Sequence, residues 1–336
     1  MISVIIPVYN AEHTIRPVVE SINEEDAEII LVDDASADKS LSVCLDIADR
    51  DPRVKVLALK ENLGCGNARN EGLKAASGEF VSFADADDLA AAGIHRSALK
   101  AMGDADWIVW GIRECFPSGK TKDSIPLSSE IIELEKQMLF GYAWNKLYRR
   151  SIIKAYQIRF PDTKLYEDYF FNIEYAKHSG RIELLKQIGY LYNKGDGNRM
   201  TNQYIPDYYP LAKRRIASML DYYNEYVKMT DRELYDKVKE VLGNRYLRYL
   251  LSALARSYDP RADLNRTDRS RWIKEVCKDR LYLTVSAACK AEHPAYGILQ
   301  RLLNRHKTGA IDRYGRAIYR IWSRREAAGK RRGVGQ

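Results

Sequence analysis

Residues 28–38 read Glu-Ile-Ile-Leu-Val-Asp-Asp-Ala-Ser-Ala-Asp, an apolar run that ends abruptly in two carboxylates. A short continuous apolar run is typical of a strand that is buried on both faces. Similar runs occupy residues 2–6, 54–59 and 79–84, and segments with helical spacing of their apolar residues separate them. Strict alternation of strands and helices predicts an α/β fold with a parallel sheet covered by helices.

Acidic side chains follow two of these predicted strands. The pair Asp33-Asp34 ends one run, and the cluster Asp85-Ala86-Asp87-Asp88 ends another. Because ligands of such sheets bind at the carboxyl ends of the strands, we expect both groups to border one crevice. Grouped carboxylate oxygens suit Mg²⁺ or Mn²⁺, which usually bridge to substrate phosphates. Taken alone, the cluster is better explained by a solvated turn with a helix cap, because Asp-x-Asp occurs often by chance.

The second half of the chain is predicted to be mainly helical. Between the sheet and residue 200 the pattern predicts strands over 106–115 and 183–193 and helices over 130–154 and 168–178. After about residue 205 the helical pattern is nearly continuous, with helices expected over 206–228, 231–257, 268–279, 294–305 and 310–325. We therefore expect the main domain boundary near residue 200.

Charge is distributed unevenly along the 336 residues, whose net charge is +8. Residues 1–100 hold 10 Lys and Arg against 18 Asp and Glu, whereas residues 301–336 hold 11 against 2. The acidic first part would repel a phosphate backbone, so we do not expect a nucleic-acid partner. No apolar run approaches the roughly 20 residues of a membrane span, and the N-terminus lacks the basic region of a signal peptide. Five scattered Cys indicate reduced thiols, as expected in the cytoplasm.

Four motifs in the first hundred residues resemble those of the family 2 glycosyltransferases. In order they are Val-Ile-Ile-Pro-Val-Tyr-Asn (4–10), Val-Asp-Asp-Ala-Ser-Ala-Asp (32–38), Asn-Leu-Gly-Cys-Gly-Asn-Ala-Arg-Asn (62–70) and Phe-Ala-Asp-Ala-Asp-Asp (83–88). Each motif is a weak signal, but four in the same order and spacing are specific. Residues 144–150 and 167–172 resemble, more loosely, family members that build bacterial capsule, lipopolysaccharide and related glycans.

The resemblance implies a GT-A fold with a Rossmann-like, mostly parallel sheet and an inverting transfer of a sugar from a nucleotide diphosphate sugar. It implies a catalytic domain at 1–200, with a nucleotide-sugar half at 1–115 and an acceptor half at 116–200. The region 201–336 would be a helical appendage. The donor is expected to be a UDP-hexose or UDP-N-acetylhexosamine. The acceptor is expected to be a growing glycan, and a polyprenyl diphosphate is one candidate carrier for it.

The same resemblance assigns donor-binding roles to residues of the motifs. One residue departs from the family pattern, because Ala35 stands where the family usually has Gly. The cofactor implied is Mn²⁺ or Mg²⁺. The implied contacts are Pro7, Tyr9 and Glu12 with the nucleoside, Asp34 with the base, Arg69 with base or diphosphate, Asp85 with ribose or metal, and Asp87 with metal and diphosphate.

An inverting displacement also needs a general base that deprotonates the acceptor hydroxyl. Glu167 and Asp168 begin a predicted helix, and acidic residues at that position are by themselves best explained as a helix cap. The resemblance favours Asp168, rather than Glu167, as the base.

Weaker expectations concern the acceptor or the diphosphate. Trp144, Lys146, Glu167 and Arg199 are the residues concerned, and Lys146 could attract an acceptor phosphate. The plainer alternatives are a helix with Trp144 in its core and a surface loop around Arg199.

Two other functions are compatible with parts of the sequence. A nucleotidyltransferase would also use an α/β crevice and metal-binding carboxylates, but it predicts a glycine-rich loop after the first strand, where residues 7–10 are Pro-Val-Tyr-Asn. A catalytically inactive sugar-nucleotide-binding or scaffold protein would bind the donor without turnover.

The C-terminal segment 310–332 predicts a basic amphipathic helix. Apolar residues recur at helical spacing, and Arg residues lie on the opposite side. This pattern is typical of a helix that lies in an anionic membrane surface, and a helix packed on its neighbours explains it equally well. The first interpretation would place the protein at the inner face of the cell membrane as a peripheral protein.

Overall fold

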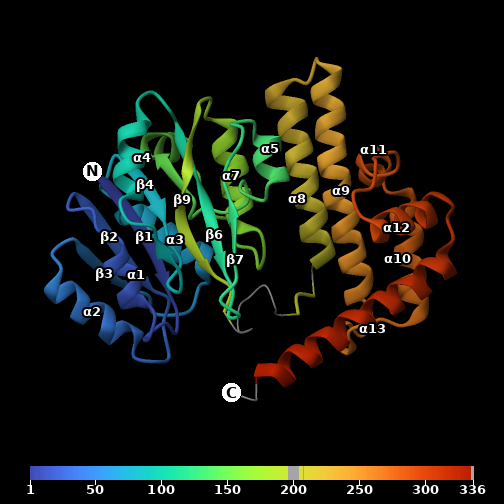
Figure 1. Cartoon of the computed structure of the whole chain (residues 1–336), viewed down its shortest axis with the longest axis horizontal. Coiled ribbons are helices and arrows are strands. Elements are labelled where there is room, and N and C mark those ends of the chain that lie inside the picture. The colour runs from blue at the N-terminus through green and yellow to red at the C-terminus, as the bar shows by residue number, and fades with distance from the viewer. Residues whose placement is uncertain (196–203, 207, 334–336) are drawn as a thin grey trace. The chain divides into compact units, whose positions relative to one another are not determined.

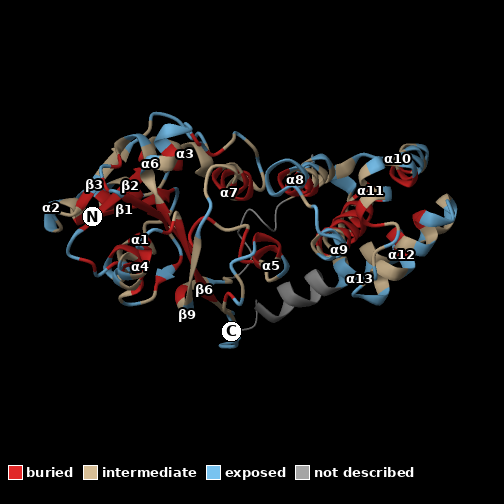
Figure 2. Ribbon diagram, turned by 90° about the horizontal axis from the view of Figure 1, so that it is seen from above, coloured by how far each residue is buried: buried red, intermediate tan, exposed pale blue. Residues whose placement is uncertain are grey.

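The computed structural model describes residues 1–195, 204–206 and 208–333, with side chains of the last helix described as far as Arg324. The chain forms two compact units, Met1–Asn202 and Gln203–Gln336. In the first unit the helices cover both faces of one sheet. Figure 2 shows α1 (Ile15–Ser21) and α4 (Ile94–Met102) on one face, and α3 (Cys65–Ala75), α6 (Arg150–Ala155) and α7 (Glu167–Lys177) on the other.

The sheet has nine strands, in the order β3-β2-β1-β4-β8-β6-β9-β5, with β7 paired to β6 (Figure 1). The strands β1 to β4 pair in parallel, as the sequence predicts. Beyond β4 the sheet is mixed, because β8 runs antiparallel to both β4 and β6, whereas β9 is parallel to β6. The bounds are β1 Ile2–Val8, β2 Ala27–Asp33, β3 Val54–Ala58, β4 Phe80–Phe83, β5 Leu89–Ala90, β6 Trp107–Cys115, β7 Thr121–Ser124, β8 Lys146–Arg149 and β9 Ile182–Asn193.

The first strand continues through Pro7, where the sequence pattern ends it at residue 6. Ile5 accepts a hydrogen bond from the Ala84 amide on the β4 side, and Val8 accepts one from the Asp34 amide on the β2 side. In a strand, the backbone N–H and C=O groups of residues i and i+2 point toward the same neighbouring strand. Pro7 therefore faces β4, as Ile5 does, and the N–H that proline lacks would lie on that side. Pairing with β4 ends at Ile5, and the proline therefore removes no sheet hydrogen bond.

The helix predicted over 130–154 is wrong. This stretch instead holds α5 (Ile131–Lys136), the strand β8 and α6. The apolar spacing of Trp144, Leu147 and Tyr148 fits a helix, but β8 pairs with β4 on one side and β6 on the other. Pairing on both edges outweighs local periodicity. The helix α2 (Ser40–Arg50) is one of the helical segments expected between the apolar runs, whereas α4, β5 and β7 were not expected from the sequence.

The second unit consists of helices. Two of them, α8 (Tyr208–Tyr222), which continues as a π-helical turn at Tyr223–Val227, and α9 (Arg232–Arg256), pack along each other. The remaining helices are α10 (Arg266–Lys278), α11 (Arg280–Val285), α12 (Pro294–Asn304) and α13 (Thr308–Gly333), with a 3₁₀ turn at Pro260–Ala262. Of these, α11 was not expected from the sequence. In the described part of the chain, no helix combines the length and the apolar character needed to cross a bilayer.

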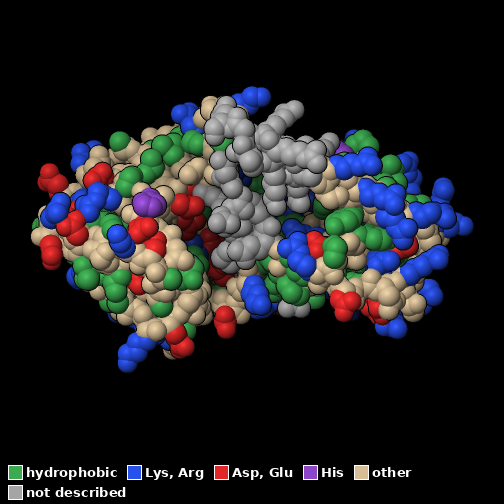
Figure 3. Space-filling view, turned by 90° about the horizontal axis from the view of Figure 1, so that it is seen from below, with side chains coloured by type: hydrophobic (Ala, Val, Ile, Leu, Met, Phe, Trp, Pro, Cys, Tyr) green, Lys and Arg blue, Asp and Glu red, His purple; other side chains and the backbone are tan. Residues whose placement is uncertain are grey.

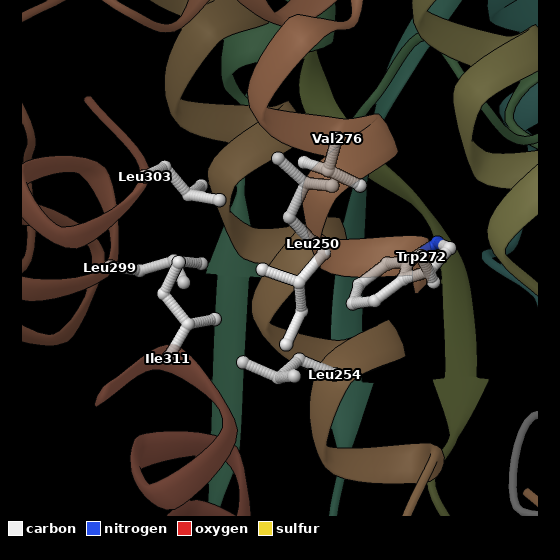
Figure 4. Close-up of a pocket in the computed structure, with 8 residues that line it drawn as sticks. Leu250, Leu254, Trp272, Val276, Leu299, Leu303 and Ile311 are labelled. Atoms are coloured by element: carbon white, nitrogen blue, oxygen red, sulfur yellow. The ribbon is translucent and has the colours of Figure 1, made fainter. Parts of the chain in front are cut away.

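The core of this unit lies around α9. Leu250 and Leu254 of α9 meet Val276 of α10, Leu299 of α12 and Ile311 of α13 around a small apolar gap (Figure 4). All five side chains are buried. The first turns of α13 are therefore part of the folded unit.

Candidate active site

The carboxyl ends of three adjacent parallel strands bring the sequence motifs together. In the sheet β1 lies between β2 and β4, so the loops that follow these strands leave from one edge. Asp34 follows β2 and Asp85 follows β4, while Tyr9 follows β1. Pro7 is buried within β1, and Tyr9 is 51% exposed. An exposed aromatic side chain beside buried carboxylates leaves a surface on which a planar group can stack.

Hydrogen bonds between the first two of these loops fix their shape. The Asn10 amide donates to Ser36 Oγ at 3.1 Å, and the Ala37 amide donates to Asn10 Oδ1 at 2.8 Å. Glu12 Oε2 accepts from the Lys39 amide at 3.0 Å. The Glu12 carboxylate is thus used to hold the neighbouring loop, and its half-buried side chain lies at the edge of the site.

The turn after β2 has a left-handed backbone at Ala35, with φ of +54°. Such a conformation explains why the family that the sequence resembles usually has glycine at this position, because a Cβ costs about 1–2 kcal/mol there. The preceding Asp34 is buried, and its two carboxylate oxygens accept from the Leu63 amide at 2.7 Å and the Gly64 amide at 2.9 Å. Asp34 therefore positions the loop that leads into α3.

A buried arginine on α3 joins the acidic end of β4 to the start of α7. Arg69 Nη2 donates to Asp85 Oδ1 at 2.7 Å, and Arg69 Nη1 donates to Asp168 Oδ1 at 2.6 Å. Glu167 Oε1 lies 3.8 Å from the same Nη1. The Arg69 side chain is 3% exposed, whereas Asp85, Glu167 and Asp168 are 28%, 18% and 16% exposed. The guanidinium is thus more deeply buried than the three carboxylates, which are only partly exposed. We call these four side chains the Arg69 cluster.

The packing around Arg69 depends on a glycine in the third motif. A Cβ on Gly66 would lie 3.3 Å from the Phe160 Cβ and 3.4 Å from the Glu167 Cγ. The first turn of α3 can therefore approach the start of α7 closely. The Phe160 ring centre lies 5.4 Å from the Arg69 guanidinium carbon, a cation–π contact.

The Arg69 cluster holds three carboxylates and one cation among its described side chains. Burial, together with the charge of Asp168, raises the pKa of Glu167 to about 7, while Arg69 acts in the opposite direction. Burial also raises the pKa of Asp168, against the effect of Arg69. Asp168 Oδ2 accepts a further hydrogen bond from the Ala143 amide at 3.1 Å. Perturbed carboxylates of this kind that remain partly exposed are typical of acid–base chemistry.

The carboxylates after β4 differ in their surroundings. Asp88 is buried, and its Oδ1 accepts from the Asn193 amide at 2.8 Å, which fixes β9 beside the turn. Asp87 is exposed, and Asp85 Oδ2 accepts no hydrogen bond from the described residues. No three acidic, His or Cys side chains in the described ranges come together as a metal site. Asp85 and Asp87 nevertheless fit a Mg²⁺ or Mn²⁺ that takes its other ligands from a diphosphate and water.

Two of the acceptor-side residues lie in the interior. Lys146 is fully buried on β8, and its Nζ donates to the Leu139 carbonyl at 2.8 Å, the Tyr142 carbonyl at 2.5 Å and Asn145 Oδ1 at 2.7 Å. Burial lowers its pKa well below the ordinary value. With its three donors used, Lys146 cannot attract an acceptor phosphate, so that expectation is wrong.

Trp144 is also an interior residue, because it is 3% exposed. Its ring stacks on Tyr142 and Tyr190, with ring centres 4.3 Å and 4.2 Å apart. The structure thus favours the core interpretation of Trp144, which lies in the turn before β8 and not in a helix. Arg199 lies outside the described residues.

Two residues of the site were not identified from the sequence. Tyr190 on β9 accepts a hydrogen bond through its hydroxyl from the Asp85 amide at 2.9 Å. Phe160 packs beneath Arg69. Neither stands in a motif, and both reach the site through tertiary contacts across distant parts of the chain, so no local signal identifies them.

Comparison with known proteins identifies the family. The model described as "Glycosyl transferase family 2" matches residues 3–157. An uncharacterized glycosyltransferase of Haemophilus influenzae is 33% identical over 185 residues, 53% of this chain and 72% of that protein. The putative glycosyltransferase EpsH of Bacillus subtilis is 35% identical over 207 residues, 57% of this chain but only 60% of EpsH.

A solved structure has the same fold. The crystal structure of Staphylococcus aureus TarS 1–349 in complex with UDP-GlcNAc matches with a TM-score of 0.67 at 23% identity, over 96% of this chain and 91% of that one. The GT-A fold expected from the sequence is thereby confirmed. The chain belongs to glycosyl transferase family 2.

Proposed function

We propose that the protein transfers a hexose or N-acetylhexosamine from a UDP-sugar to a glycan acceptor, with inversion at the anomeric carbon and Asp168 as general base. One observation carries the proposal. Arg69 binds a carboxylate of the strand-end motif and the candidate base at the same time, at 2.7 Å and 2.6 Å. These contacts support a single site that contains the proposed donor-binding edge and the candidate base.

The donor side is supported by the shape of the strand-end loops. Exposed Tyr9 would contact the nucleoside, together with Pro7 and Glu12. Asp34 holds the loop at Leu63 and Gly64 and would face the base from there. The bound UDP-GlcNAc in the TarS structure supports a uridine nucleotide as the donor's leaving group.

Asp85 and Asp87 would hold Mn²⁺ or Mg²⁺ with the donor diphosphate. A bound divalent ion stabilises the negative charge that develops on the leaving diphosphate. Arg69 remains beneath this charge as a fixed cation that is already in place before the reaction, so its orientation requires no reorganisation.

In the transfer step the acceptor hydroxyl oxygen attacks the anomeric carbon. The bond from that carbon to the phosphate oxygen breaks, its electron pair leaves with the nucleotide diphosphate, and the hydroxyl proton passes to Asp168. Asp168 suits this role because Arg69 and the Ala143 amide both bind its charged form. Glu167 has only the longer contact of 3.8 Å to Arg69. With a pKa of about 7 it is partly protonated at neutral pH.

The proposed acceptor is a growing glycan of the cell surface, for which a polyprenyl diphosphate would be a suitable carrier at the cytoplasmic face of the membrane. An inactive sugar-nucleotide-binding protein is the alternative that shares the same donor site. Turnover separates the two, because only an enzyme requires the base.

The first prediction concerns the base. Asp168→Asn should lower turnover by about 10²–10⁴-fold, the usual contribution of a general base. UDP affinity should change little, because the side chain would face the acceptor. Single-turnover kinetics and calorimetry with UDP measure the two effects. The control Asp162→Asn changes an exposed carboxylate on the preceding loop and should keep full activity. An Asp168→Asn variant with more than about half of the wild-type rate would remove Asp168 from the mechanism.

The second prediction concerns the metal. Asp87→Ala should weaken UDP binding and abolish its dependence on Mn²⁺, because the carboxylate that links ion and diphosphate is lost. Titration calorimetry with Mn²⁺ and with EDTA measures this dependence. Asp104→Ala, which removes an exposed carboxylate elsewhere in the unit, should leave it intact. Equal UDP affinity of the wild-type protein in Mn²⁺ and EDTA would refute the proposal.

The third prediction concerns stability and pH. Because the pKa of Glu167 is raised to about 7 in the folded protein, this residue contributes its full stabilisation below its unfolded pKa, about 4.3. The contribution is lost as the pH rises through about 7. Glu167→Gln cannot lose a proton, so it should be more stable than wild type at pH 8, by up to about 3 kcal/mol, and by only about 1 kcal/mol at pH 5. Urea unfolding at both pH values measures the difference.

The exposed residue Glu61 provides the control, since Glu61→Gln should show no such dependence. A stability difference between Glu167→Gln and wild type that fails to grow with pH would contradict the raised pKa.

A further inference from the structure

The helix α13 has two parts with different surroundings. Its first turns are anchored in the helical unit, where Ile311 and Asp312 are buried. Arg269 Nε donates to Asp312 Oδ1 at 3.2 Å, and the Tyr258 hydroxyl donates to the Asp312 carbonyl at 2.5 Å. A Cβ on Gly315 would lie 2.5 Å from the Leu254 Cγ, so this glycine allows α13 to cross α9 closely. The first turns of α13 are therefore held in a fixed position on the other helices of the unit.

After these first turns, the apolar face of α13 is no longer covered by the other helices of the unit. At 100° per residue, Ile318, Ile321 and Trp322 continue the face that buries Ile311. Ile321 is 48% exposed and Trp322 is 37% exposed, whereas Ile311 is 1% exposed. Figure 1 shows α13 continuing past the helices on which its first turns pack. A large aliphatic and an indole side chain are thus adjacent on an uncovered surface. We call Ile318, Ile321 and Trp322 the distal face.

The opposite side of α13 is basic. Arg313, Arg316, Arg320 and Arg324 are all exposed, and they lie on the side of the helix that faces away from the distal face. They belong to a strongly cationic unit, because residues 203–336 hold 29 Lys and Arg against 15 Asp and Glu. Figure 3 shows Lys and Arg side chains distributed over much of this unit.

We propose that the distal part of α13 docks on an anionic lipid surface, with the distal face in the headgroup–acyl boundary. An amphipathic helix with Trp and Ile on one side and Arg on the other is suited to that boundary. The proposal does not depend on the proposed function, because its residues are separate from the Arg69 cluster.

Other occupants fit the observations less well. A second copy of the chain would bring one unit with a net charge of +14 against another, and the like charges repel. A soluble polyanion would match the arginines but would leave Ile321 and Trp322 exposed to water. A lipid surface satisfies the charge and the apolar face together.

The test is flotation of the full chain with vesicles of phosphatidylcholine alone and with phosphatidylglycerol added. Binding is expected only to the anionic vesicles. High salt should weaken it, because salt screens the attraction between the arginines and the lipid headgroups. We use substitutions and not truncation, because deletion of the whole of α13 would also remove Ile311 and expose the core shown in Figure 4.

Two matched pairs of variants separate the apolar from the electrostatic contribution. Ile321→Ser with Trp322→Ser should weaken vesicle binding about tenfold or more. The control Leu264→Ser with Leu283→Ser removes side chains that are 45% and 54% exposed elsewhere in the unit and should have little effect. Arg320→Glu with Arg324→Glu should also weaken binding about tenfold or more. Its control, Lys274→Glu with Arg305→Glu, makes the same charge change at exposed positions on α10 and directly after α12.

UDP affinity should be unchanged in all four variants, so a failure of vesicle binding is distinguishable from a failure of the donor site. Three results would overturn the proposal. These are wild-type protein that does not float with anionic vesicles, an Ile321/Trp322 variant that floats as well as wild type, and a concentration-dependent oligomer that the same variant abolishes. Retention on soluble polyphosphate that is insensitive to that variant would point instead to a polyanion.

Discussion

One buried guanidinium fixes the geometry on which the site depends. Arg69 extends from α3 to carboxylates that come from two other elements, Asp85 after β4 and Asp168 in the first turn of α7. A buried charge without partners is costly, so each partner constrains where Arg69 lies, and Arg69 constrains them in turn. The sheet edge that would hold a nucleotide and the helix that would hold the base are therefore fixed relative to each other.

The charges of the same cluster explain why a cation should bind near it and why one of its carboxylates should retain a proton. It places three carboxylates around one positive charge, and burial adds to their mutual repulsion. The position of Glu167 and Asp168 at the start of α7 partly offsets this cost, because the helix dipole favours negative charge there. The raised pKa of Glu167 is the remainder of that cost. A functional site that retains such a strain, rather than relieving it, is consistent with acid–base chemistry.

Much of the first unit could be predicted from the sequence, because its strands are short apolar runs and its candidate binding residues follow them at one sheet edge. The exceptions have tertiary causes. Residues 146–149 form β8 because they pair on both edges, although their apolar spacing is that of a helix. Lys146 is a basic residue in a recognisable motif, yet its three donors are used by Leu139, Tyr142 and Asn145 within the core. When a strand is mistaken for a helix, the spacing of the residues no longer predicts which way each side chain faces.

The Arg69 cluster was only partly predictable for a similar reason. The motifs identified Arg69, Asp85 and Asp168 separately, whereas their mutual contact spans 99 residues along the chain. Tyr190 and Phe160 support the cluster from outside every motif. In the second unit the amphipathic pattern of α13 was visible, but only the structure shows that Ile311 is in the core while Ile321 is exposed.

The most direct measurement of the central claim is a double-mutant cycle between Arg69 and Asp168, with Arg69→Met, Asp168→Asn and the double variant compared by urea unfolding at pH 7. If the two charges hold each other in place, each single change removes one partner from the buried charge that remains, although Arg69 would keep Asp85. The double variant should then be more stable than the sum of the single effects implies, by about 2 kcal/mol or more. Single effects that add to within about 0.5 kcal/mol would contradict the account, since Arg69 would then not couple the donor edge to the base.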